Sequence, residues 1–389
     1  MTIDRRAPAT ALTLLGLMLL LRLWIPVSFS DASPYARMNL LTAVEPRALM
    51  GTMLHALSGH AEMRHRLLLG INLVSVMAWL GCVLALVGGR SLGGNAGRPL
   101  SMAERLAWAA LFAFSANPYH AYISMFVDMP AAALVAATAL ACTALPHRVT
   151  ATRVLGVTLL ALASTLVHEK SLFDLALLAL WFSYWRGPAA AAALLGPAFL
   201  LTGGFLLASS ENASWGLPTR DYAAYAVNPI FTESVNVWGI LVGGGAFWLV
   251  YGVLGGWFCR AAMSRTDRLW RTLLVAAMLL VCLGTLLVAH DTNRMVALIW
   301  LPTALLAGAV IHRPYHRPFG ARAFAALIVL QLAAPPSLIF KHGMLPYNCY
   351  AARLGQRLPQ ESVVGQVGGL SLMSYDRNYL TQVMNARCR

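Results

Sequence analysis

The stretch VAHDTNRMVAL, Val288–Leu298, lies between two apolar runs, 272–289 and 294–312, that are each long enough to cross a membrane as a helix. Its polar turn consists of five consecutive residues, His290, Asp291, Thr292, Asn293 and Arg294. A second stretch, TLVHEKSLF at Thr165–Phe173, places a histidine, an acid and a cation in nearly the same order between two further apolar runs. The recurring unit is therefore an apolar helix, a short polar tip and a returning apolar helix.

The composition favours the same architecture for the whole chain. Of the 389 residues, 59% are hydrophobic and 11% are charged, whereas a soluble domain carries roughly a quarter charged residues. Most of the chain is therefore expected to lie in lipid. We predict an all-α, polytopic integral membrane protein with about eleven transmembrane helices, at about 9–29, 68–89, 106–127, 129–146, 154–168, 171–185, 188–209, 237–259, 272–289, 294–312 and 323–340.

The arginines indicate how these helices are oriented. If the N-terminus is cytoplasmic, alternating spans place fifteen arginines on the inner side, whereas the short outer connections hold only Lys170, Arg220 and Arg294. Cytoplasmic loops of membrane proteins carry such an excess of lysine and arginine. The net charge of +14 therefore requires no nucleic-acid partner. Most of the acids fall on the outer side, which is where we expect the reactive groups.

We expect one transmembrane helical domain, 1–340, followed by a small extracytoplasmic tail, 341–389, that is too short for a core of its own. Two outer loops, 30–67 and 210–236, are longer than a hairpin needs. Apolar residues at helical spacing in the first loop predict one or two interfacial helices with their apolar faces toward lipid. The first span, 9–29, has no clear cleavage site after it and is interpreted as an uncleaved anchor.

The two polar tips each end at the N-terminus of a helix that runs inward, near Ser171 and near Thr292. Free N–H groups and the helix dipole make such termini anion sites, and Lys170 and Arg294 add charges that suit phosphate. We therefore predict that a substrate phosphate is bound by Arg294, Lys170, Asp291, His290 and His168. In the structural alternative, Asp291 and Ser171 are simple N-caps, the histidines satisfy the last carbonyls of the preceding helices, and the cations extend to the interface.

Several acids are candidates for a catalytic base. Asp31, in SFSDASPYARMN, could deprotonate an acceptor hydroxyl or cap an interfacial helix that begins near Ser33. Asp128 follows the irregular run FSANPYHAYISMFV, which is either a proline-kinked helix or the lining of an outer cavity. Asp174 lies one turn inside its span, where an acid is either functional or paired with Lys170 at i,i+4.

The sequence predicts no metal site held by the protein alone. A set of two histidines and two carboxylates would form only if both tips met, from His168, Glu169, His290 and Asp291. A magnesium or manganese ion that bridges a bound diphosphate is left open. Cys349 and Cys388 both lie in the tail and could form a disulfide in an oxidising compartment, which is also left open.

These features resemble the GT-C class of membrane glycosyltransferases. The resemblance rests on an acid in a long first outer loop, Asp31, and on the stretch NPYHAYISMFVDMPAAAL, in which Asp128 stands before a proline and a span of small residues. The tips VHEKSLF and HDTNR are also similar to the His- and Arg-bearing outer tips of polysaccharide polymerases. The resemblance is architectural, extends over about 1–340, and implies a base at Asp31 and carrier-phosphate contacts at Arg294 and Lys170.

One departure from the family pattern concerns the base. Many GT-C enzymes carry paired acids in the first loop, whereas Asp31 is followed by Ala32 and Ser33. Asp128 and Glu169 are therefore the substitutes for this role.

The resemblance implies a glycosyltransferase of the bacterial inner membrane, with a cytoplasmic N-terminus and an extracytoplasmic C-terminus. It would take a sugar from a polyprenyl-phosphate or polyprenyl-diphosphate carrier and transfer it to an envelope glycan or lipid acceptor on the outer leaflet. The alternative is a transporter or flippase for a lipid-linked or anionic solute. Because the charges cluster at one face and no inverted repeat is evident, the enzyme is favoured. A non-catalytic partner in an envelope assembly complex is also compatible with the sequence.

Overall fold

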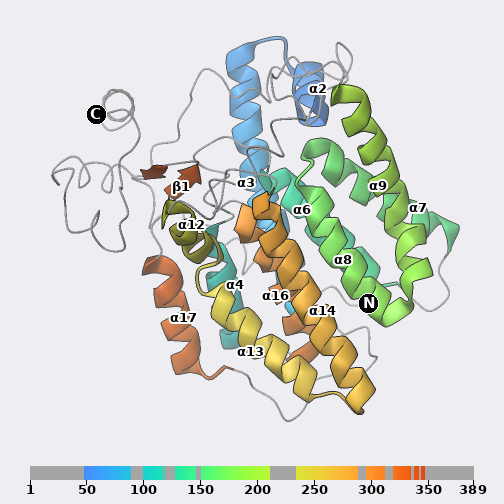
Figure 1. The fold of residues 1–389 in the computed structure, drawn as a ribbon. Helices are drawn as coiled ribbons and strands as arrows, with labels where there is room; N and C mark the ends of the chain where they lie inside the picture. Colours follow the sequence, from blue (N-terminus) through green and yellow to red (C-terminus); the bar gives the residue numbers. More distant parts are fainter. Residues whose placement is uncertain are drawn as a thin grey trace, which may run out of the picture.

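The structure, a computed structural model, describes residues 48–88, 100–116, 118, 128–145, 150–210, 234–287, 295–311, 319–333, 337–340 and 343–346. Within these ranges the elements are helices apart from one short hairpin, so the all-α prediction is confirmed in its main part (Figure 1). The elements are α2 (Ala48–Leu57), α3 (Ala61–Gly88), α4 (Met102–Ala113), α6 (Asp128–Thr143), α7 (Ala151–Val167), α8 (Ser171–Arg186), α9 (Pro188–Ser210), α12 (Ser234–Gly244), α13 (Phe247–Arg260), α14 (Arg265–Gly284), η2 (Thr285–Leu287), η3 (Ala297–Ile299), α16 (Trp300–Val310), α17 (Ala321–Ala333), β1 (Ser337–Phe340) and β2 (Gly343–Pro346).

Local sequence signals explain several helix ends. At the start of α4, the Ser101 hydroxyl accepts the Glu104 N–H at 3.3 Å, and the Glu104 carboxylate accepts the Ser101 N–H at 2.7 Å. This capping box satisfies two amides that the helix cannot satisfy internally. Helix α8 ends at Arg186 because Gly187 adopts a φ of 90°, and Pro188 then begins α9. The Gly-Pro pair thus makes the sharp turn between these two helices.

Four helices, α3, α6, α8 and α16, form a ring in which each contacts the next; we call it the helix ring. Contacts between α3 and α16 fix their relative direction. The ring centroids of Trp79 and Trp300 are 5.4 Å apart. About two turns later on both helices, a Cβ on Gly308 would lie 2.5 Å from the Leu86 carbonyl oxygen. Because both pairs advance together, α3 and α16 run parallel, and Gly308 permits their close approach.

The other two helices of the ring begin at the same end. Leu68, near the start of α3, shares a buried cluster with Ala131, near the start of α6. Phe173, near the start of α8, packs against a cluster containing Met295 and Val296, which precede α16. All four helices therefore direct their N-termini, and the positive ends of their dipoles, to one end of the helix ring.

The glycine-rich stretch LVGGGAFWLVYGVLGG, 241–256, breaks the predicted span 237–259 into α12 and α13. Gly245 has a φ of 49°, and a Cβ there would lie 2.5 Å from the Gln331 side-chain oxygen. This buried oxygen accepts the Ala246 N–H at 2.6 Å, while the Trp248 indole N–H donates to the Ile240 carbonyl at 2.9 Å. The broken backbone is thus satisfied by side chains, as buried irregular backbone requires.

The last predicted span, 323–340, is wrong over its final part. Helix α17 ends at Ala333, and residues 337–340 form β1, which pairs antiparallel with β2. Pro335 and Pro336 explain the difference, because proline lacks the amide hydrogen that a continuing helix needs. The predicted domain boundary after residue 340 falls between β1 and β2.

Helix α2 lies in the loop predicted to hold interfacial helices, but its apolar residues divide between two environments. Met50 and Leu54 are buried together with Leu68, whereas Met53 and Leu57 are exposed. The predicted apolar face toward lipid is therefore only partly present, because half of it packs against the helix ring and α7.

One helix among the described residues, Arg66–Gly88, is long and apolar enough to cross a membrane. Five further apolar helices in this part of the chain have 10–17 residues, fewer than the roughly 20 that span a hydrocarbon core. The candidate span belongs to α3 and therefore to the helix ring.

Candidate functional site

Asp128 is the first residue of α6 and is 6% exposed. Helix α4 stops at Ala113, and most of the irregular run before Asp128, residues 117 and 119–127, lies outside the described residues. His120 lies outside the described residues. A carboxylate in the first turn interacts favourably with the α6 dipole, and this alone would account for an acid at the position.

The turn His168–Glu169–Lys170 joins α7 to α8. His168 ends α7 in an extended conformation, and Lys170 occupies the N-cap position of α8 without making a side-chain cap. Ser171 is already helical, so it is not the N-cap of the structural alternative. The His168 ring also does not satisfy the end of α7 in the way that alternative requires, because its Nδ1 accepts the Lys170 N–H at 3.1 Å.

The structure brings this turn against Asp128. The Lys170 Nζ lies 3.4 Å from the Asp128 Oδ1, and the His168 Nε2 lies 3.9 Å from the same oxygen. The Glu169 Oε2 lies 3.3 Å from the His168 Nδ1, and the Glu169 side chain is 27% exposed. Four residues predicted for the site therefore meet from two separate stretches of sequence.

A backbone hydrogen bond fixes the tautomer of the neutral His168 ring. Since its Nδ1 accepts the Lys170 N–H, the hydrogen of the neutral ring belongs on Nε2, which faces Asp128. Glu169 also approaches Nδ1, where two acceptors would face one another. Protonation of the ring would turn Nδ1 from an acceptor of the amide into a donor to Glu169.

Asp174 joins the group from the first turn of α8. It is 3% exposed, and its Oδ1 has no hydrogen-bond partner within the described part of the chain. It lies within electrostatic range of both Lys170 and Asp128. We call the set Asp128, His168, Glu169, Lys170 and Asp174 the carboxylate–lysine cluster.

The second predicted tip, 288–294, lies outside the described residues, and so do its site residues Arg294, Asp291 and His290; the same holds for Asp31. The residues that flank this tip are described. Leu286 and Met295 share one cluster, and Phe173 packs against it three residues after Lys170. The flanks of the two tips therefore lie side by side at the end of the helix ring that carries the cluster.

The cluster has more acids than cations. Three carboxylates accompany one lysine, and Lys170 is buried against Asp128 rather than facing water. This pair joins residues of separate helices and is not revealed by local spacing, and the phosphate contact of Lys170 stays a prediction. Among the described residues there is no group of three or more His, Cys, Asp or Glu side chains that could hold a metal ion. The cluster is thus better suited to accept and hold protons than to bind an anion unaided.

Two buried polar features escaped the sequence analysis. Asn72 on α3 is fully buried, and neither polar atom of its side chain has a hydrogen-bond partner in the described ranges. Thr202 on α9 donates to the Thr165 hydroxyl at 2.6 Å, just before the tip at His168. The sequence signal for both features is an amide or hydroxyl group inside an apolar run, because burying such a group without a hydrogen bond costs free energy.

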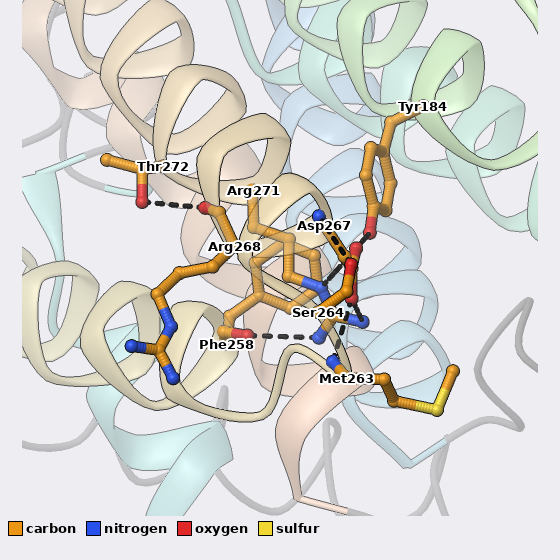
Figure 2. A network of polar contacts seen from close by, with 8 residues as sticks. All are labelled: Tyr184, Phe258, Met263, Ser264, Asp267, Arg268, Arg271 and Thr272. Carbon is orange, nitrogen blue, oxygen red and sulfur yellow. Dashed lines mark hydrogen bonds and ion pairs between the residues drawn. The ribbon is translucent and has the colours of Figure 1, made fainter.

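A second polar group, which we call the arginine network, consists of Tyr184, Phe258, Asp267 and Arg271 at the other end of α8 (Figure 2). The Arg271 guanidinium contacts both Asp267 oxygens, at 2.9 and 3.0 Å, and donates to the Phe258 carbonyl at 3.0 Å. The Tyr184 hydroxyl donates to Asp267 at 2.7 Å and accepts from Arg271 at 3.0 Å. Arg271 also lies 4.7 Å above the Phe258 ring. The network joins α8, α13 and α14.

The hydrogen bonds of this network govern the charge of Asp267. Burial alone would raise the pKa of Asp267, but hydrogen bonds from Tyr184, Arg271 and the Met263 amide, together with the guanidinium charge, outweigh it. The pKa of this carboxyl is therefore held below its ordinary value, and Asp267 is ionised at neutral pH.

No protein-family model matches this sequence, and no curated protein or solved structure matches it either. The function therefore has to be argued from the site itself.

Proposed function

We propose that the chain is a multi-pass protein of the bacterial inner membrane, with about eleven spans, a cytoplasmic N-terminus and an extracytoplasmic tail. The candidate span in α3 and the distribution of arginines support this. Large apolar side chains also lie exposed on several helices, including Val74, Leu200 and Leu280. Such side chains are stable against lipid and unfavourable in water. In this orientation the carboxylate–lysine cluster faces the outer leaflet.

We further propose a GT-C-like glycosyltransferase that takes a sugar from a polyprenyl-phosphate or polyprenyl-diphosphate carrier. The observation that carries the proposal is the approach of Lys170 to Asp128 at 3.4 Å across separate helices. A carboxylate kept ionised by a lysine can serve as a general base. Glu169 is the most accessible acid of the cluster, with 27% of its side chain exposed.

In the proposed reaction, an acceptor hydroxyl attacks the anomeric carbon of the donor sugar. The bond from that carbon to the carrier phosphate breaks, the carrier leaves with the bonding electrons, and Asp128 takes the hydroxyl proton. Arg294 holds the phosphate, with Asp291 and His290 beside it. Lys170 stands between base and phosphate, and His168 orients Asp128. Asp31 contributes from the first loop. If the donor is a diphosphate, a magnesium or manganese ion would neutralise part of its charge.

The decisive experiment measures carrier release from a labelled polyprenyl-linked sugar by the purified full-length protein. We expect turnover in the unchanged protein and none in Arg294→Ala. The matched control is Arg268→Ala, which removes an exposed arginine from α14 far from the cluster. Equal turnover in Arg294→Ala and Arg268→Ala would eliminate Arg294 as the phosphate ligand, and no turnover in any preparation would eliminate the transferase.

A transporter or flippase for a lipid-linked or anionic solute is the second candidate. It is favoured by the break between α12 and α13 together with the buried Asp174, since transporters place broken helices and buried charges along their substrate path. Uptake into sealed vesicles without any sugar transfer would support this function over the enzyme.

A further inference from the structure

Helices α13 and α14 form an antiparallel hairpin. Near the turn, the Arg271 guanidinium donates to the Phe258 carbonyl at 3.0 Å, and further from the turn the Tyr251 hydroxyl donates to the Val275 carbonyl at 2.6 Å. Residues 261–264 join the two helices. The end of α13 and the start of α14 therefore lie on the same side of the molecule.

Each helix of this hairpin carries an exposed apolar stripe that ends in an arginine beside the turn. The spacing along α14 is i, i+4 and i+8 from Arg265, and along α13 it is i−11 and i−7 from Arg260, so each stripe lies on one helix face. The apolar side chains of the stripes are 39–58% exposed and are Leu249 and Val253 on α13, and Leu269 and Leu273 on α14. We call Arg260 and Arg265 the turn arginines.

The turn arginines have no partner within the described part of the chain. Both are exposed, and neither forms an ion pair or a side-chain hydrogen bond there. Asp267 is the one acid of residues 247–284, and its carboxylate is already held by Arg271. A third exposed arginine, Arg268, is followed at i+4 by Thr272 and belongs to neither stripe. The charge beside the turn is therefore positive and uncompensated.

The helices themselves account for only one of the turn arginines. Arg260 stands in the last turn of α13, where a cation interacts favourably with the helix dipole. Arg265 is the first residue of α14, where the dipole disfavours a cation. An anion beside the turn removes this conflict.

The order of charge and apolar surface is that of a boundary between lipid and water. From Arg260 to Leu249 the stripe on α13 extends about 16 Å at 1.5 Å per residue, about half of a hydrocarbon core. Trp270, which is 59% exposed, lies near the charged end, and tryptophan is enriched at membrane interfaces. Met263, in the turn, is 95% exposed, and Figure 2 shows its side chain extending away from the arginine network. A soluble anion would suit the arginines but would leave the stripes unexplained.

We propose that the turn arginines bind the phosphate groups of anionic phospholipids in the inner leaflet. The apolar stripes lie against the acyl chains, and the two guanidiniums meet the headgroup layer where the stripes end. Each guanidinium offers a planar set of donors that suits phosphate oxygens. The inference rests on the proposed membrane location but not on the transferase reaction.

Thermal unfolding of the purified full-length protein in neutral detergent tests the site, with phosphatidylglycerol or phosphatidylcholine of identical chains added in steps. We expect phosphatidylglycerol to raise the melting temperature at lower concentrations than phosphatidylcholine. Arg260→Gln and Arg265→Gln should each raise the half-saturating concentration of phosphatidylglycerol about fivefold, and the double variant roughly thirtyfold. Arg153→Gln is the matched control and should change it less than about twofold. Arg153 is also exposed near a helix start, but Val157, one turn further, is buried, so Arg153 heads no apolar stripe.

Equal half-saturating concentrations for the two lipids, or unchanged phosphatidylglycerol binding in the folded double variant, would overturn the lipid site. The same rise in melting temperature with inorganic phosphate would also overturn it, because a free anion would then suffice. Arg260→Lys with Arg265→Lys keeps both charges and should keep the preference for phosphatidylglycerol; its loss would contradict recognition by charge. Alkaline carbonate washing of membranes tests the membrane location separately. Release of the protein would eliminate the multi-pass arrangement, while the lipid titration still decides the site.

Discussion

The carboxylate–lysine cluster and the arginine network stand at opposite ends of α8, about 20 Å apart at 1.5 Å per residue. Both contain buried charges, but their geometry differs. In the arginine network, the contacts among Tyr184, Asp267 and Arg271 are 2.7–3.0 Å long. In the cluster, the contacts of Asp128 with Lys170 and His168 are 3.4 and 3.9 Å long.

The difference separates two uses of buried charge. A network whose donors and acceptors match holds helices together, because breaking it would leave buried groups unsatisfied. A cluster with excess acid and long contacts contributes less to stability and leaves its groups able to take new partners. We therefore assign Arg271 to the scaffold and, under the proposed function, Asp128 to the reaction.

The largest expected effect of breaking the cluster is on turnover. Asp128→Asn keeps the shape of the side chain and removes the base, so carrier release should fall by roughly a thousandfold, within the range for general-base catalysis. Its melting temperature should also fall, because the buried Lys170 loses its carboxylate partner, so turnover is compared per folded molecule. Parallel assays of turnover and thermal unfolding check both statements, and Asp128→Glu should restore part of the activity. Unchanged turnover in folded Asp128→Asn would contradict the assignment.

The opposite result is expected at the other end of α8. Arg271→Ala leaves the Phe258 carbonyl and the Asp267 carboxylate without their main donor, and we expect a loss of about 3 kcal/mol in the free energy of unfolding. The exposed Arg268→Ala should cost less than about 0.5 kcal/mol. Reversible unfolding in detergent measures both. Turnover per folded molecule should not change, and a selective loss of turnover in Arg271→Ala would erase the distinction between the two regions.

Much of the helical layout follows from local sequence, and the exceptions have identifiable causes. The predicted spans 129–146, 154–168 and 171–185 lie close to α6, α7 and α8, because their apolar runs end at polar tips or a Gly-Pro pair. The break at Gly245 could not be predicted from the same patterns. It depends on Gln331 from another helix, and the stretch around it is apolar throughout.

The site was predictable by residue type but not by pairing. An acid two residues before a proline and a charged tip single out Asp128 and Lys170, yet their contact spans 42 residues of sequence. Spacing on α8 suggests Asp174 as a possible i,i+4 partner of Lys170, and leaves a functional role for this acid open. Which acid the lysine contacts is decided by how α6 packs on α8, and that is tertiary information.

The smallest expected effect concerns pH and the arginine network. The pKa of Asp267 is lowered by its hydrogen bonds from an ordinary value of 3.8, so the folded state favours the ionised form. The stabilisation is complete above the ordinary value and is lost as pH falls through the lower folded value. Because the Asp267 side chain is 24% exposed, water screens part of the effect.

Melting temperatures measured from pH 7 down to about 3 should therefore fall more steeply at the acid end for the unchanged protein than for Asp267→Asn, which has no proton to take up. Asp128→Asn should keep the steep acid fall, because it leaves the arginine network intact. Identical acid slopes in the unchanged protein and Asp267→Asn would mean that this carboxylate does not contribute to acid stability. The contribution of the arginine network to stability would then come only from the contacts of Arg271 with Phe258 and Tyr184.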